Sequence, residues 1–588
     1  MIITKRLTGL VVVAVVLLTA CGKKAPAYTK YIPKDASNVV SVDVKSLLLK
    51  LNSDSLTLEN MTSVFKEGHG ASDYAEMMNR YKDFKDAGLD LDSKVFLATS
   101  AFDFNKYNSS FSVQFVAGMK DSKKFEEFLK KQKETGEIRK GEGYSYTGTD
   151  EVAIGWNEDA VMIVYSSNAK KYNDYESDTA EMSRPKSADV AGGPAEKLKK
   201  YFKLEKKESI LSVDGFNDLQ GKTADVAIFN QVNLDGISGM AFAFLPKVKE
   251  LVEGAYGTTT INFEDGKIEV ESTSTTGKKM ADILKKYAGP EVDMSLLENY
   301  PSQNVDGVMA FSFKPELIPA LIKETGFDAL LGIGLSQTGL SLDDFAKVFK
   351  GDFAVAVSDF AVEKKEIDMG KDAMGSYSRE VPSAKMVFVA KIGDKAIFNK
   401  LVALGEKQGF IIRNGNMLII ANNGQPAEGS PIVISTANDL LTIASDSATL
   451  LAYQNKSQKI GLSDEAKGKI KGSAIAAFVD VEKILNGISS NVFDSTDVTL
   501  ANVMAKSKAT FKNFSFSTSN FSGSSVKGKG EIVFGDAKKN SLAQIVRYGM
   551  YVAEQYKLHE AEQAKKYQED STTDVIADST AAPVESVK

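Results

Sequence analysis

Four segments of this chain recur later in the sequence in the same order, and this repetition restricts the folds that it can adopt. The clearest pair aligns without a gap, Phe115–Phe125 (FVAGMKDSKKF) with Phe388–Phe398 (FVAKIGDKAIF). In both copies an apolar run predicts a strand, and Asp121 or Asp394 then stands near the N-cap of a predicted helix. The other pairs are Pro33–Leu48 with Pro301–Leu317, Gly88–Thr99 with Gly339–Val357, and Asn157–Val164 with Ala437–Ala444. We interpret the mature chain as two tandem halves; the alternative is that strand-helix units resemble one another by chance.

A second kind of module, rich in long alternating strands, follows each of these blocks. Thr258–Ser272 predicts a hairpin around Asp265-Gly266, because such a turn needs a positive φ that glycine adopts at little cost. A helix is expected next, from Lys278 to Tyr287. The later copy has the strands Ala509–Thr518 and Val526–Phe534, then a helix that begins at about Ser541.

Hairpins and alternation determine the expected fold class. Asn414-Gly415 is a second hairpin signal, and Ala477–Leu485 repeats the strand-helix character of Val40–Leu48. These features favour antiparallel or mixed sheets with one solvated face over a doubly wound parallel sheet. We therefore expect an α+β protein of tandem-duplicated modules with packed helices, preceded by a lipoprotein signal peptide.

Composition shifts divide the chain further. The predicted divisions are a signal peptide (1–20), a tether (21–30), module A1 (31–205), module B1 (206–297), module A2 (298–455), module B2 (456–566) and a disordered tail (567–588). The tail is rich in Ser, Thr, Asp, Ala and Pro and has little to bury.

The amino terminus has the pattern of a bacterial lipoprotein signal. Lys5 and Arg6 precede the apolar run Leu10–Leu18, which is too short for a stable span of a hydrocarbon core of about 30 Å. Leu18-Thr-Ala-Cys21 resembles a lipobox, so we expect cleavage between Ala20 and Cys21 and a lipid, such as palmitate, on Cys21. An ordinary signal peptide with a chance cysteine and a retained membrane helix are the alternatives. Several acyl chains would hold the protein durably on the membrane.

The residues after Cys21 indicate whether the lipid anchor lies in the inner or the outer membrane. They read Gly-Lys-Lys-Ala-Pro, and by resemblance to lipoprotein sorting signals the missing Asp favours the outer membrane. No acidic cluster like a surface-export signal follows, so we expect the periplasmic face; the cell surface is the alternative. The tether from Cys21 to Tyr31 spans at most roughly 35 Å.

Composition excludes several classes of site. Cys21 is the only cysteine and the chain has two histidines, so we expect no disulfide, no thiolate or zinc site, no metal and no cofactor. With 72 basic and 78 acidic residues the net charge is −6, which argues against nucleic acid as a partner. The partners to expect are the membrane, through the N-terminal lipid, and an envelope protein or an apolar ligand.

Catalytic patterns are weak throughout, and we assign no catalytic residue. His69 lies between glycines and His559 on a polar terminal helix, so both are expected at the surface. Ser63 and Lys66 have the S-x-x-K spacing of penicillin-recognising enzymes, but the accompanying K-T-G is interrupted in both places where it could stand. The spacing of Gly332–Gly339 does not suit a dinucleotide loop.

Three further residues are weighed as ligand contacts. Asp90 and Asp92 lack the glycine and terminal glutamate of a calcium loop, and we expect a solvated turn. Trp156 could stack on a sugar, but packing at a strand end is the favoured interpretation.

The start Tyr31–Leu47, the block Ala87–Asp92 and the lipobox together resemble a family of large uncharacterised Bacteroidota lipoproteins defined as a domain of unknown function. The resemblance implies a structural plan over nearly the whole mature chain. It implies no activity and no catalytic residues.

Three hypotheses follow. The first is a noncatalytic protein that binds or scaffolds a partner at the outer membrane. The second is a periplasmic carrier of a lipid or other apolar ligand, which requires an apolar pocket of several hundred Å3. The third is a carboxylate-dependent hydrolase, which requires a cleft with converging acidic groups.

Overall fold

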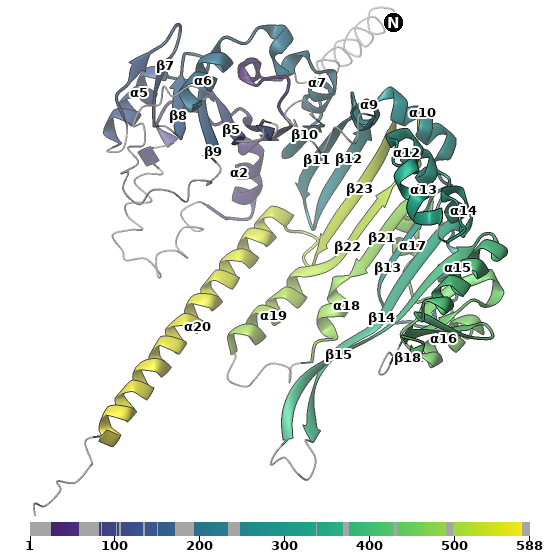
Figure 1. Ribbon diagram of the computed structural model, residues 1–588. Coiled ribbons are helices and arrows are strands. Elements are labelled where there is room, and N and C mark those ends of the chain that lie inside the picture. Colours follow the sequence, from purple (N-terminus) through teal and green to yellow (C-terminus); the bar gives the residue numbers. More distant parts are fainter. Residues whose placement is uncertain are drawn as a thin grey trace, which may run out of the picture.

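The computed structural model describes residues 25–57, 82–83, 85–100, 103–104, 108–132, 136–149, 151–170, 193–232, 247–336, 338–368, 376–427, 432–489 and 498–578. Its strands form a large antiparallel sheet with helices packed against it (Figure 1), so the predicted α+β class is confirmed. The signal peptide and Cys21 lie outside the described residues.

The sheet runs without interruption through both halves of the sequence. From its first edge the order is β6 (Arg139–Lys140), β7 (Ser145–Gly148), β8 (Val152–Trp156), β9 (Ala160–Lys170), β5 (Asn108–Met119), β3 (Val95–Thr99), β1 (Asn38–Val42), β10 (Val226–Gln231), β11 (Tyr256–Glu264) and β12 (Lys267–Thr275). It continues with β23 (Ser525–Phe534), β22 (Phe511–Thr518), β21 (Ile475–Asp480), β13 (Val305–Ser312), β14 (Phe349–Asp368), β15 (Ser376–Ile392), β20 (Leu440–Ala444), β19 (Val433–Ser435), β17 (Met417–Asn422) and β16 (Ile411–Asn414). Read outward from the β12–β23 pair, the two halves have matching strand orders.

A smaller repeat is visible within each half. In the described part of the chain, strand, helix, strand, strand and helix follow one another four times, and the three strands of each unit are neighbours in the sheet. The helices of these units are α2 (Val44–Ser53) and α5 (Ser122–Lys131); α9 (Val248–Val252) and α10 (Lys278–Tyr287); α12 (Leu317–Thr325), α13 (Asp328–Ser336), α14 (Leu342–Lys347) and α15 (Lys395–Lys407); and α18 (Val481–Asn486), α19 (Val498–Thr510) and α20 (Ser541–Asp578). One sheet contains strands of all four predicted modules, and the borders between the modules stay a prediction.

Local sequence signals account for many element boundaries. The Asp121 carboxylate accepts the amides of Lys123 and Lys124 at the start of α5, and Asp394 caps α15 in the same way, as expected. Gly266 and Gly415 turn their hairpins with φ of 71° and 60°. Helix α10 has the predicted bounds.

Two predicted segments differ from the structure. The tether was expected to reach residue 30, but the 3-10 helix η1 (Ala27–Tyr31) already packs in the core, because Tyr28 is buried against Phe96 and its hydroxyl donates to the Lys94 carbonyl. The disordered tail was expected from residue 567, but α20 continues to Asp578. Among the described residues, no helix is both long and apolar enough to span a membrane.

Each half has its own main core on the sheet. In the first half Phe96, Phe216 and Phe229 are fully buried, and Phe216 packs against the other two rings. In the second half Tyr300, Leu450 and Ile470 hold the equivalent role. A smaller cluster joins the halves, where Leu542, Val546 and Met550 of α20 pack against Leu51 of α2.

Candidate ligand-binding sites

An apolar cavity of about 390 Å3 lies between the helices α12, α13 and α14 and the strand β14. Its walls carry only apolar side chains, among them Phe313, Phe345, Phe349, Phe353, Leu331 and Leu335. A pocket of this size and lining suits an acyl chain or a similar apolar ligand, and it meets the size that the carrier hypothesis requires.

The aromatic wall of this cavity is formed where β13 ends and β14 begins. Phe353 lies 4.8 Å from Phe311 and 5.8 Å from Phe313 between ring centroids, and Phe349 meets it edge-on at 5.7 Å. Gly351 between them has a φ of 94°, and a Cβ there would lie 1.8 Å from the Phe313 carbonyl oxygen. The two strands can therefore approach closely enough for the rings to stack.

The helical wall consists of three short helices separated by glycine turns. Gly326 ends α12 in the left-handed region with a φ of 80°. Gly339 has a φ of 65° and precedes Ser341, whose capping box with Asp344 starts α14. These breaks fold the segment back over the cavity.

A second apolar cavity, of about 250 Å3, lies under α15 against β16, β17, β19 and β20. Phe398, Val402, Leu418 and Ile434 contribute to its walls. It is smaller than the first and provides a matched comparison within the same chain.

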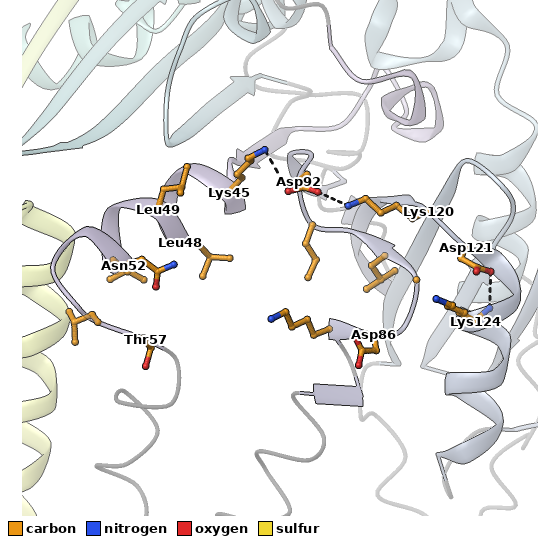
Figure 2. A pocket seen from close by; sticks show the side chains of 16 residues that line it. Lys45, Leu48, Leu49, Asn52, Thr57, Asp86, Asp92, Lys120, Asp121 and Lys124 are labelled. Carbon is orange, nitrogen blue, oxygen red and sulfur yellow. Dashed lines mark hydrogen bonds and ion pairs between the residues drawn. The ribbon is translucent and has the colours of Figure 1, made fainter.

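A charged pocket of about 690 Å3 lies between α2 and the start of α5 (Figure 2). Lys120 and Lys45 reach Asp92 from opposite sides, at 2.5 Å and 3.7 Å from its carboxylate oxygens, while Leu48 and Leu49 belong to the α2 wall. The hydrogen bond from Lys120 is the main reason why the pKa of Asp92 lies below its usual value. Residues 58–81, which follow Thr57 at the rim, lie outside the described residues, and we assign no ligand to this pocket.

Two of the three carboxylates that line this pocket, Asp92 and Asp121, already have partners. The Asp121 carboxylate is occupied by capping α5, and Asp92 is held by lysines. Asp90 also accepts Lys120, at 3.3 Å, and Ser93. Within the described residues no group of three or more His, Cys, Asp and Glu side chains is placed to hold a metal ion. The solvated turn expected at Asp90 and Asp92 is thus an ion-paired turn.

The remaining sequence candidates are placed as follows. Trp156 is 2% exposed and packs edge-on against Phe125 at 5.5 Å, which confirms that it is a core residue. His559 is half-buried on α20. His69, Ser63, Lys66, Ala20 and Cys21 lie outside the described residues, so their predicted roles stay predictions.

Two buried aspartates were not identified from the sequence, and they differ in their partners. The Asp225 carboxylate accepts hydrogen bonds from Ser46 Oγ and Lys50 Nζ, both at 2.6 Å, and from the Phe263 amide at 2.7 Å.

Asp306 is 2% exposed, and its Oδ2 accepts a hydrogen bond from the Phe360 amide at 2.7 Å. Its Oδ1 is buried and accepts no hydrogen bond from the described residues. Burial, and secondarily the nearby Asp359, raises the pKa of Asp306. No sequence motif marks either residue, because their partners come from other elements.

The apolar cavity also went unpredicted, although the sequence contains a signal for it. The stretch from Ala329 to Leu342 has no charged residue, which is unusual for a surface segment of a chain in which 26% of residues are charged. Hydropathy alone could not place it over a cavity, because the aromatic wall comes from separate strands.

Comparison with known proteins places the chain in a family without giving it a function. A family model described as "Domain of unknown function (DUF4836)" matches residues 28–369. No curated protein matches the chain. Two solved structures, crystal forms IV and I of TP0453, align at 10% identity with a TM-score of 0.22; they cover 43% and 46% of this chain, and 81% and 89% of theirs. Similarity this low supports no functional argument.

Proposed function

This chain belongs to the family described as a domain of unknown function (DUF4836), and on that premise we propose that it is a lipid-anchored, noncatalytic envelope protein that binds an apolar ligand under α12, α13 and α14. The single observation that carries the proposal is the apolar cavity of about 390 Å3. Its chemistry suits the acyl chain of a fatty acid or phospholipid.

The shape of the cavity supports a ligand role over a packing defect. Its floor is a stack of phenylalanines held by two strands, which is a rigid surface, whereas its cover is three short helices joined by glycine turns. A preformed apolar pocket binds an apolar ligand with little reorganisation. The hydrolase hypothesis has less support, since two of the three carboxylates that line the charged pocket, Asp92 and Asp121, are engaged by lysines and by backbone amides.

The anchor completes the proposed function. The lipobox supports acylation of Cys21, and its neighbours support placement in the outer membrane with the body in the periplasm; exposure at the cell surface is the alternative. Because Tyr28 is already buried in the core, the connection from Cys21 to the body is only a few residues long. The cavity would then lie near the lipids from which a ligand could come.

The ligand is tested by mass spectrometry of organic extracts from the purified protein and by titration with a fluorescent fatty acid. Ala346→Phe projects a ring into the cavity and is expected to lower binding at least tenfold. Val402→Phe makes the matched change at the smaller cavity and should leave binding intact. A wild-type protein that carries no lipid and binds no fatty acid would refute the proposal, and so would equal loss in both variants.

The anchor is tested separately by mass spectrometry of the protein purified from cells that produce the full chain. The wild-type protein should begin at Cys21 and carry the added mass of the lipid there, and Cys21→Ser should lack that mass. A wild-type protein with no added mass on Cys21 would refute the anchor.

A further inference from the structure

Helix α13 exposes large apolar side chains beside the face that lines the apolar cavity. Leu330, Leu331 and Ile333 are 65%, 42% and 72% exposed. The glycines between and after them, Gly332 and Gly334, are also exposed, and a Cβ at either would meet nothing within 4 Å. Apolar side chains of this size are normally buried against a partner or in the core.

The distribution of these side chains limits what can cover them. Leu330 and Ile333 stand three residues apart and share one face of α13, whereas Leu331 and Leu335 line the apolar cavity. An interfacial helix buries such an apolar face at the boundary between headgroups and acyl chains. Large exposed apolar groups of this kind mark interaction sites.

Of the helices α9, α10, α12, α13 and α14, α10 alone carries a net positive charge, the sign that an anionic phospholipid surface attracts, whereas α14 has two aspartates and one lysine. Helix α10 carries four lysines, Lys278, Lys279, Lys285 and Lys286, against one acidic residue, Asp282. It packs beside α12, and Lys279 links the helices through ion pairs of 2.9 Å to Glu250 and 3.2 Å to Glu324. A lysine near an anionic lipid surface contributes about 1 kcal/mol.

The position of these helices leaves them accessible. Figure 1 shows α9, α10, α12, α13 and α14 gathered along one margin of the sheet, while α20 and the β14–β15 hairpin extend the other way. A flat surface could therefore approach α13 without meeting either projection.

We propose that α13 inserts into the interfacial region of an anionic phospholipid bilayer, with the lysines of α10 at the headgroups. Leu331 and Leu335 line the apolar cavity from the same helix, so insertion would place the cavity beside the acyl chains. The inference rests on the proposed function only for the lipid anchor that brings the body to a membrane.

The test is flotation of the mature chain carrying Cys21→Ser with vesicles of phosphatidylethanolamine and phosphatidylglycerol. The unlipidated protein should float, and Leu330→Glu with Ile333→Glu should lower its partition more than tenfold, since burial of one such side chain contributes about 1.5–3 kcal/mol and 1.4 kcal/mol corresponds to tenfold. Phe410→Glu, at a side chain 64% exposed beside β16, is the matched control and should float like the parent. All three side chains are exposed, so the fold should survive.

A second readout uses the single buried tryptophan as a constant background. Leu330→Trp should show a blue shift of emission when vesicles are added, while Trp156 contributes an unchanged signal. Absence of the shift, or equal loss of flotation in Phe410→Glu, would overturn the proposal. So would a dimer in light scattering that Leu330→Glu dissociates without any vesicle binding, because the second copy would then be the occupant.

Failure here is distinguishable from failure of the proposed function. Ala346→Phe should lose the ligand and still float, whereas the glutamate variants should keep the cavity, because neither Leu330 nor Ile333 lines it.

Discussion

Replacement of Asp306 by asparagine should stabilise the protein at neutral pH, although it changes a buried residue. The carboxylate accepts one described hydrogen bond, leaves Oδ1 buried without one, and lies near Asp359 and Asp480. Asparagine keeps the acceptor for the Phe360 amide and removes the buried negative charge. Burial of a charge without a direct ion pair is costly, so we expect a gain of about 1 kcal/mol at pH 8.

The effect should depend on pH in a definite direction. Burial raises the pKa of Asp306 above its value in the unfolded chain, so the folded protein binds the proton more tightly. The stability that this protonation contributes is complete below the unfolded pKa of about 4 and is lost as the pH rises through the folded pKa. The advantage of Asp306→Asn should therefore be small at pH 4 and grow toward pH 8.

Thermal unfolding followed by circular dichroism at several pH values measures this effect. A gain of about 1 kcal/mol corresponds to a shift in Tm of about 2 °C if the half unfolds as one unit. Asp225→Asn is the control, because it removes an ion pair with Lys50 at 2.6 Å and should cost about 3 kcal/mol at pH 7. If Asp306→Asn destabilises by the same amount at every pH, Asp306 is a packed hydrogen-bonding group and the reasoning is wrong.

Two further predictions concern local structure. Gly266→Ala should lower the free energy of unfolding, measured with denaturant, by more than about 2 kcal/mol, because it combines a φ of 71° with a Cβ placed 2.6 Å from backbone. Gly415→Ala has a φ of 60° and open space around its Cβ, so it should lower that free energy by only about 1 kcal/mol. Equal losses in the two variants would contradict the steric argument. Asp121→Ala and Asp394→Ala each remove two hydrogen bonds from backbone amides at a helix start, so each should lower the free energy of unfolding by about 1 kcal/mol. A loss near zero in both variants would show that water replaces the caps.

The features that the sequence predicted correctly depend on neighbouring residues. Asp121 caps the helix that follows it, and Gly266 turns the strands on either side of it, so a few adjacent residues contain the whole interaction. The repeated segments were recognisable for the same reason. The hairpins and the alternation indicated an α+β chain with antiparallel or mixed sheets, and the strands pair antiparallel.

The features that went unpredicted depend on contacts between distant residues. The pairing of Lys267 with Val533 at the centre of the sheet joins segments that share no local signal. The cavity needs Phe353 from β14 opposite Leu331 from α13, and the partners of Asp306 come from other strands and helices. Tyr28 was assigned to the tether because burial of a single tyrosine leaves no periodic pattern.

The pairing of β12 with β23 joins the two halves into one sheet and determines which surfaces are open to association. Strands β12 and β23 pair along their lengths, from Lys267–Val533 to Thr275–Ser525, and Asn540 at the start of α20 bonds to both Asp54 and the Phe263 carbonyl of the first half. The long strands therefore face one another inside the sheet. The outer strands are short, two residues in β6 and four in β16, and short edges offer little backbone for pairing with another chain. Beyond these short edges, the end of β14 from Glu363 to Asp368 pairs only with β15 among the described strands, so the β14–β15 hairpin and the exposed apolar helix α13 are the surfaces open to association.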